Sequence, residues 1–109
     1  MPSIDDRITS DITSNPIVLY MKGTALMPMC GFSARAVDLL RRHCQHFTTK
    51  NVLEDPELRE GIKIFSSWPT IPQLYVNGDF IGGCDIIVEM EEEGTLGPLL
   101  LSAASSSPQ

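Results

Sequence analysis

The sequence lacks features that several large protein classes require. Its longest uninterrupted apolar run, Ile17–Met21, is far shorter than the ~20 residues that cross a bilayer, so we expect no membrane span. Lys and Arg total 8 against 14 Asp and Glu, the net charge is -6, and no stretch is rich in basic residues. This composition argues against a protein that binds nucleic acid by neutralising phosphates.

Cysteine is also scarce. There are three cysteines, an odd number that does not form a disulfide framework. The first six residues show neither the basic nor the apolar region of a signal peptide. We therefore expect a cytoplasmic protein with free thiols in a reducing compartment. A chain of 109 residues is predicted to form one domain, residues 1–101, followed by a flexible, small and polar tail, residues 102–109.

Hydrophobic periodicity and turn residues predict the secondary structure. Ile17–Met21 has the continuous apolar pattern of a strand buried on both faces, and Asn77-Gly78 is a strong hairpin signal. Asp55-Pro56 has the pattern of a helix start. The predicted helices and strands, in order, are helix 4–13, strand 17–21, helix 30–44, a weaker strand 47–52, a helix from 56, strands 73–76 and 79–81, a helix from 85, and a short helix 95–101.

The order of these elements predicts the fold class. Helices alternate with strands in the first half, which favours a parallel βαβ unit, and a hairpin closes the second half. We therefore expect an α/β fold in which helices flank both faces of a mixed four-stranded sheet.

Cys30 is the residue that carries most chemical information. It lies where a loop meets a helix after a buried strand, so the helix N-terminus, with Lys22 nearby, would favour the thiolate. The alternative is a buried, inert cysteine. In Cys30-Gly31-Phe32-Ser33, serine replaces the second cysteine of a dithiol enzyme, so a mixed disulfide at Cys30 must be resolved by an external thiol or a distant cysteine. Cys44 lies on an apolar helix stripe and is predicted to be a core residue.

Pro72 is the second signal. A proline before a strand at a sheet edge can adopt the cis peptide, which would leave the backbone of Ile71 unpaired and facing a peptide-like ligand. The alternative is an ordinary loop proline.

Charged residues near two helix starts complete the candidate site. After Gly82-Gly83, Asp85 is placed to cap a helix and to accept a ligand ammonium, and a simple helix cap is the alternative. Arg59 and Lys63 are four residues apart and share one helix face, so they are candidate carboxylate binders. A solvated face is the alternative for this pair.

The sequence resembles monothiol glutaredoxins of the Cys-Gly-Phe-Ser class over roughly residues 3–101. Several independent motifs carry the resemblance in the same order: Met21-Lys22-Gly23-Thr24, Pro28-Met29-Cys30-Gly31-Phe32-Ser33, Trp68-Pro69-Thr70-Ile71-Pro72-Gln73-Leu74, and Asn77-Gly78 through Gly82-Gly83-Cys84-Asp85. The loop between Gly23 and Cys30 also resembles this class, in which it favours cluster binding over thiol transfer.

The resemblance implies a thioredoxin-like fold with a cis Pro72 and a glutathione site. In that site cationic side chains would hold the glycine carboxylate, one backbone segment would pair with the cysteinyl moiety, and two residues would bind the γ-glutamyl end. These roles fall, in that order, on Lys22, Arg59 and Lys63, on Ile71, and on Cys84 and Asp85.

The resemblance also implies a bridging [2Fe–2S] cluster with Cys30 as its metal ligand. Such a cluster requires four thiolates, so two chains and two glutathiones would supply them and the homodimer would separate when the cluster is lost. The expected function is assembly or transfer of the cluster, with apo iron–sulfur proteins and a BolA-type protein as partners. The alternative is a glutathione-dependent thiol–disulfide oxidoreductase with Cys30 as its catalytic nucleophile; any such enzyme activity is expected to be weak. Spacing leaves open whether Cys84 pairs with Cys30.

Overall fold

The computed structural model describes residues 2–105. Its helices and strands follow the predicted order, with one additional 3₁₀ turn, η1, after the second strand. The elements are α1 (Ile4–Ser14), β1 (Ile17–Met21), α2 (Gly31–Arg41), β2 (Thr48–Asn51), η1 (Val52–Glu54), α3 (Pro56–Ser66), β3 (Gln73–Val76), β4 (Asp79–Gly82), α4 (Cys84–Glu93) and α5 (Leu96–Ser105).

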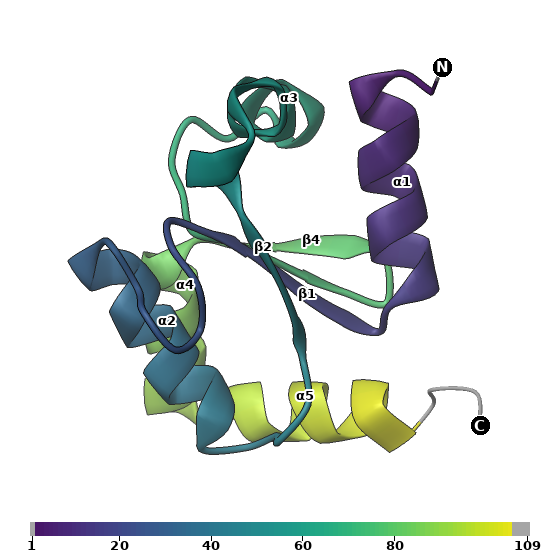
Figure 1. Cartoon of the computed structure of the whole chain (residues 1–109). Coiled ribbons are helices and arrows are strands. Elements are labelled where there is room, and N and C mark those ends of the chain that lie inside the picture. Colours follow the sequence, from purple (N-terminus) through teal and green to yellow (C-terminus); the bar gives the residue numbers. More distant parts are fainter. Residues whose placement is uncertain (1, 106–109) are drawn as a thin grey trace.

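The four strands form one mixed sheet in the order β2-β1-β3-β4. Strands β1 and β2 are parallel, whereas β3 is antiparallel to both β1 and β4. Helices α1 and α3 cover one face of the sheet, and α2, α4 and α5 cover the other (Figure 1). The predicted α/β class and mixed four-stranded sheet are therefore confirmed.

Local sequence explains where several elements begin and turn. The Ser3 hydroxyl accepts a hydrogen bond from the Asp6 amide and the Asp6 carboxylate accepts one from the Ser3 amide, which caps α1. Asp55 caps α3 through the Leu58 amide, at 3.1 Å. Asn77 and Gly78 both adopt positive φ, which suits the two-residue hairpin between β3 and β4.

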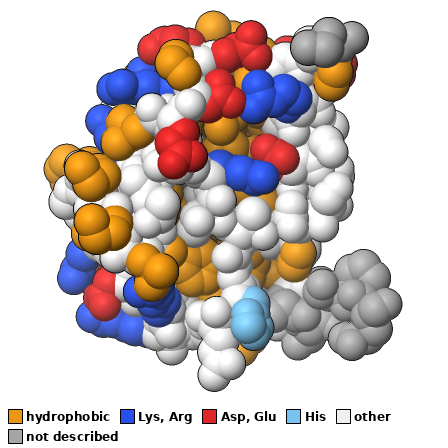
Figure 2. Space-filling view, viewed as in Figure 1, with side chains coloured by type: hydrophobic (Ala, Val, Ile, Leu, Met, Phe, Trp, Pro, Cys, Tyr) orange, Lys and Arg blue, Asp and Glu red, His pale blue; other side chains and the backbone are white. Residues whose placement is uncertain are grey.

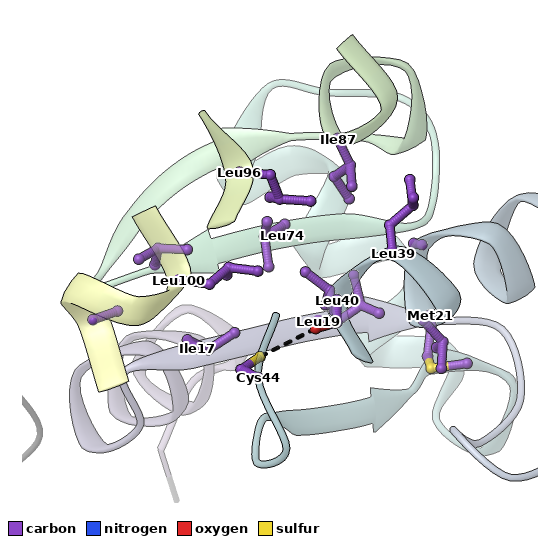
Figure 3. Packing of buried hydrophobic residues seen from close by; sticks show 14 residues of the cluster. Ile17, Leu19, Met21, Leu39, Leu40, Cys44, Leu74, Ile87, Leu96 and Leu100 are labelled. Carbon is purple, nitrogen blue, oxygen red and sulfur yellow. Dashed lines mark hydrogen bonds between the residues drawn. The ribbon is translucent and has the colours of Figure 1, made fainter. Parts of the chain in front are cut away.

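Strand β1 separates two buried clusters because successive side chains point to opposite faces of a sheet. Val18 and Tyr20 pack toward α1 and α3. The alternate residues pack with Leu74 against the other three helices, and Figure 3 labels Ile17, Leu19 and Met21 in this second cluster. Burial on both faces is the physical reason for the continuous apolar run that predicted this strand.

The boundaries of α2 and α5 differ most from the predicted ones. Helix α2 begins after Cys30 and ends at Arg41 rather than 44, because its last turn tightens to bonds such as His43 N–H to Leu40 O at 3.1 Å. Residues 102–105, predicted as tail, continue α5, and Ala103 is fully buried in the core. The rest of the predicted tail, residues 106–109, lies outside the described residues. Within the described part of the chain, no helix is long and apolar enough to cross a membrane.

Candidate active site

A cleft of about 360 Å³ lies where five segments of the chain meet. The residue after β1, the start of α2, the end of α3, the loop before β3 and the start of α4 all contribute to its walls. The lining residues are Lys22, Cys30, Phe32, Lys63, Trp68, Pro69, Thr70, Ile71, Pro72, Gly83, Cys84 and Asp85. The fold thus brings together every predicted site residue except Arg59.

Cys30 is the N-cap residue of α2 and is partly exposed in the cleft. The backbone N–H of Ser33 is the largest influence that lowers the pKa of the Cys30 thiol below its ordinary value. Burial opposes this effect, whereas the Phe32 amide, the charge of Lys22 and the Ser33 hydroxyl add to it. The predicted thiolate-favouring environment is therefore present, and hydrogen bonding at the helix N-terminus is its main cause.

Lys22 is held through its backbone, next to the thiol. Its N–H donates to the Ser33 hydroxyl at 3.1 Å, and its carbonyl accepts from the Met29 amide at 2.9 Å. The following residue, Gly23, donates its N–H to Asn51 Oδ1 at 2.9 Å. The hydroxyl of Ser33, which replaces the second cysteine of a dithiol motif, therefore links the end of β1 to the first turn of α2.

The loop after Lys22 closes on itself. The N–H of Thr24 donates to the carbonyl of Met27 and the N–H of Met27 donates to the carbonyl of Thr24, both at 3.1 Å. Gly23 has a φ of 92°, and a Cβ at this position would collide with the Met27 carbonyl and with the backbone of Met29. Glycine is therefore required here for both conformation and space.

The opposite wall of the cleft is the segment from Trp68 to Pro72. The Ile71–Pro72 peptide bond is cis, as predicted. Among residues 2–105, the structure shows no hydrogen bond from the backbone of Ile71 to the rest of the protein. Its N–H and C=O are thus available to an extended ligand in the cleft.

The start of α4 forms the third side of the cleft. The prediction that Asp85 caps this helix is wrong: Gly83 is the N-cap residue, the helix begins at Cys84, and no side chain caps it. A carboxylate caps a helix from the position before the first turn, and Asp85 is already inside that turn. The first N–H groups of α4 therefore have no side-chain partner and face a cleft that Cys84 and Asp85 also line.

The two basic residues of α3 separate in the structure. Lys63 lines the cleft, but Arg59 does not. Although the two residues share a helix face, they lie one helical turn apart, and the cleft extends only along the C-terminal end of α3.

The three cysteines occupy different environments. Cys30 and Cys84 both line the cleft and are free thiols. Cys44 is buried in the core, where its Sγ donates to the Leu40 carbonyl at 3.4 Å (Figure 3). The prediction that Cys44 is a core residue is confirmed. Within the described part of the chain, no group of three or more His, Cys, Asp or Glu side chains is arranged to hold a metal ion.

Large apolar side chains are exposed beside the thiol. Figure 2 shows hydrophobic side chains gathered on the left of the face in view, around the start of α2. The exposed residues of this region are Leu26, Met27, Met29 and Phe32, of which Leu26 is 86% exposed. Sequence reasoning also missed the side-chain hydrogen bonds of Gln73 to the Trp68 and Thr70 carbonyls and of Asn51 to the Gly23 amide, because a single carboxamide residue has no sequence pattern that marks such a contact.

Comparison with known proteins agrees with this geometry. The glutaredoxin family model matches residues 17–81, which include the thiol, the proline loop and most of the sheet. The chain is 54% identical to monothiol glutaredoxin-5 of Saccharomyces cerevisiae, a mitochondrial protein, over 97% of this chain and 73% of the relative.

The chain belongs to the monothiol glutaredoxin family. It is also 47% identical to glutaredoxin 4 of Pasteurella multocida over 95% of each protein. Among solved structures, reduced apo GrxS14 of poplar superimposes with a TM-score of 0.82 at 43% identity, covering 97% of both chains. The holo form of glutaredoxin C1 from Populus tremula x tremuloides gives a TM-score of 0.83 at 25% identity, covering 94% of this chain and 91% of the other. The thioredoxin-like fold implied by the sequence is thereby confirmed.

Proposed function

We propose that this protein binds glutathione in the cleft and, as a dimer, carries a [2Fe–2S] cluster for assembly or transfer to iron–sulfur proteins. One observation carries the proposal. A single thiol with a lowered pKa lies in a cleft that has cations on one side, an unpaired backbone segment on another and an uncapped helix start on the third.

These three features match the chemistry of glutathione, a tripeptide with two carboxylates and one ammonium. Lys22 and Lys63 would hold the glycine carboxylate, and Arg59 has no part in the proposal because it lies outside the cleft. The free backbone of Ile71 would pair with the cysteinyl moiety. At the start of α4, the backbone amides would bind the γ-glutamyl carboxylate, while the Asp85 carboxylate would accept its ammonium.

The donor set fits a cluster shared between two chains as cargo. A [2Fe–2S] cluster takes four thiolates, and no described group of His, Cys, Asp and Glu in one chain provides a metal site. Cys30 offers one accessible thiol that favours the thiolate. Two copies of Cys30 and two bound glutathiones would complete the ligand count, which makes the dimer a consequence of the one-cysteine site.

Thiol–disulfide exchange is a second candidate function, favoured by the same lowered pKa. The Cys30 thiolate would attack the glutathionyl sulfur of a protein–glutathione disulfide, which releases the protein thiolate and leaves glutathione on Cys30. A second glutathione thiolate would attack that sulfur, which forms oxidised glutathione and returns the Cys30 thiolate. Ser33 cannot resolve the mixed disulfide, so in this proposal an external glutathione does so.

Anaerobic reconstitution with iron, sulfide and glutathione, followed by size-exclusion chromatography with visible absorbance, tests the main proposal. We expect a coloured dimer that becomes a colourless monomer when glutathione is removed. Reconstitution of Cys30→Ser is the control for adventitious iron and should give no colour. A colourless monomer of folded wild-type protein would overturn the carrier function, and turnover of a glutathionylated peptide without iron would then support the exchange reaction.

The compartment and the protein partners stay predictions. The curated relatives include a yeast protein named as mitochondrial and a bacterial glutaredoxin 4, so family membership is compatible with either setting. Cytoplasmic location therefore remains the prediction made from the absence of a signal-peptide pattern, and a BolA-type partner and apo iron–sulfur acceptors remain what the resemblance implies.

A further inference from the structure

Gln73 is a buried polar residue whose side chain reaches back to the wall of the cleft. It is the first residue of β3, directly after Pro72, and is 0% exposed. Its Nε2 donates to two carbonyl oxygens, those of Trp68 and Thr70, each at 3.1 Å. Trp68 and Thr70 both line the cleft, but Gln73 does not. The carboxamide therefore supports this wall from behind.

The wall has few other hydrogen bonds. Pro69 and Pro72 have no N–H group, and among residues 2–105 the structure shows no hydrogen bond from the backbone N–H of Thr70 or Ile71. At the start of the segment, the Trp68 N–H donates to the Lys63 carbonyl. From there to β3, the hydrogen bonds that fix the backbone come from the Gln73 side chain.

The carboxamide is used for its donors alone. Its NH₂ group must face the two carbonyls, because an amide oxygen in that position would have no hydrogen to share with them. The Gln73 Oε1 atom is buried and has no hydrogen-bond partner among the described residues. Leaving a buried acceptor unpaired is unfavourable, and this cost offsets part of the gain from the two donated hydrogen bonds. What the arrangement secures is the position of the Trp68 and Thr70 carbonyls.

We propose that Gln73 is a positioning residue that holds the Trp68–Thr70 segment in the conformation that receives the cysteinyl part of glutathione. This inference rests on the glutathione-binding function proposed above. Gln73 acts through the loop and not by contact with the ligand. It would fix Ile71, whose free backbone lies between Thr70 and Pro72, before the ligand arrives, which lowers the entropy cost of binding.

The protein contains a built-in reporter of this loop. Trp68 is the single tryptophan of the chain, and it packs on Gly83 and against Phe80, with the two ring centroids 5.9 Å apart. Its fluorescence and its quenching by acrylamide therefore report whether the loop is held, independently of any ligand.

The test compares wild type, Gln73→Met and Gln73→Glu with Tyr75→Phe as a matched control. Gln73→Met keeps the length but removes both donors. Tyr75 lies two residues along the same strand and its hydroxyl is buried, and Tyr75→Phe leaves both hydrogen bonds of Gln73 to the loop in place. Binding of S-methylglutathione by calorimetry avoids thiol chemistry, and thermal melting reports stability.

In Gln73→Met we expect the Kd for S-methylglutathione to rise about tenfold and acrylamide quenching of Trp68 to increase, with Tyr75→Phe unchanged in both. In Gln73→Glu a carboxylate would repel the two carbonyls, whereas a protonated carboxyl can donate to one of them. Its affinity should therefore recover in part as the pH falls from 8 to 6, relative to wild type over the same range.

Each outcome decides the inference. A lower melting temperature in Gln73→Met with unchanged affinity and unchanged Trp68 quenching would show a merely structural role and overturn it. If Gln73→Met does not fold, the pH-dependent recovery of Gln73→Glu decides in its place, and no recovery overturns the inference. If wild type does not bind S-methylglutathione, the proposed function fails, and the positioning of the loop is then judged by Trp68 quenching alone.

Discussion

Cys30 and Cys84 occupy nearly equivalent positions but have opposite chemistry. Each lies at the N-terminus of a helix, each is partly buried, and both line the same cleft. Yet the pKa of the Cys30 thiol is lowered, whereas burial and the negative charge of Asp85 raise the pKa of the Cys84 thiol. Helix position alone therefore does not activate a thiol in this protein.

The difference comes from the groups that face each sulfur. Cys30, as the N-cap residue, is stabilised as a thiolate by the Ser33 and Phe32 amides and by the charge of Lys22. Burial is the largest cause of the raised pKa of Cys84; the negative charges of Asp85 and of the Cys30 thiolate add to it, and Arg35 opposes them. Burial and the neighbouring charges therefore shift the pKa values of the two thiols in opposite directions.

Replacement of each cysteine in turn should give the largest difference in activity between the two positions. We expect Cys30→Ser to abolish both mixed-disulfide formation with oxidised glutathione and colour after iron–sulfur reconstitution, because it removes the only thiol of the pair that favours the thiolate. Cys84→Ser should retain most of both activities. Mass spectrometry and visible absorbance measure the two effects, and comparable losses in the two variants would remove the functional difference between the thiols.

The wild-type protein itself offers the next test. At pH 7, iodoacetamide should alkylate Cys30 severalfold faster than Cys84, since the thiolate is the nucleophile and the lower pKa of Cys30 gives it the larger thiolate fraction. The thiolate fraction of each group rises with pH, so the Cys30 rate should level off at a lower pH than the Cys84 rate. The ratio should shrink above both pKa values. Peptide mapping of the alkylated protein measures both rates, and equal rates at pH 7 would contradict the assigned pKa directions.

Removal of the Lys22 charge should reduce the difference in reactivity between the two cysteines by slowing Cys30. Lys22→Gln removes a charge that lowers the pKa of Cys30, so alkylation of this thiol at pH 7 should fall about threefold. Lys63→Gln is the matched control, because Lys63 lines the same cleft but does not shift that pKa. Both variants should bind glutathione less tightly. An equal fall in alkylation in the two variants would show that the total positive charge of the cleft, and not Lys22 in particular, raises the reactivity of Cys30.

The smallest expected effect is on the alkylation rate of Cys84. Asp85→Asn removes a charge that raises the pKa of Cys84, so its alkylation at pH 7 should increase about twofold while that of Cys30 is unchanged. Burial, the larger cause, is left in place, which limits the gain. Glu89→Gln, on the same helix, controls for a general change in net charge. Peptide mapping measures the alkylation rates of both cysteines. If burial alone set the pKa of Cys84, the alkylation rate of Cys84 would not rise.

Local sequence patterns predicted the fold well because the features that they indicate depend on residues close together in the chain. The buried strand β1, the Asp55 cap and the Asn77-Gly78 hairpin all depend on residues a few positions apart, and each is present in the structure. The boundaries that failed, at the end of α2 and in α5, depend on packing. Ala103 belongs to a helix because a core is available to bury it, which small side chains in a tail do not reveal.

The candidate site also contains residues that the sequence predicted and residues that it did not. Motif order pointed to Cys30, Lys22, Ile71 and Cys84, and all of them meet at one cleft. How the elements pack decided that Arg59 lies outside the cleft. The role of Gly83 in place of Asp85 as the helix cap and the contacts of Gln73 are local, but no sequence pattern marked them.

The sequence by itself determined the elements, their order, the family and the identity of the thiol, because these follow from periodicity, turn chemistry and contiguous motifs. Only the tertiary structure decided which groups shift the pKa of each cysteine and which charges reach the ligand cleft. These properties depend on distances between residues remote in the chain, such as Lys22 and Ser33 or Gly23 and Asn51. Electrostatic and hydrogen-bond energies change steeply over such distances, and sequence separation does not encode them.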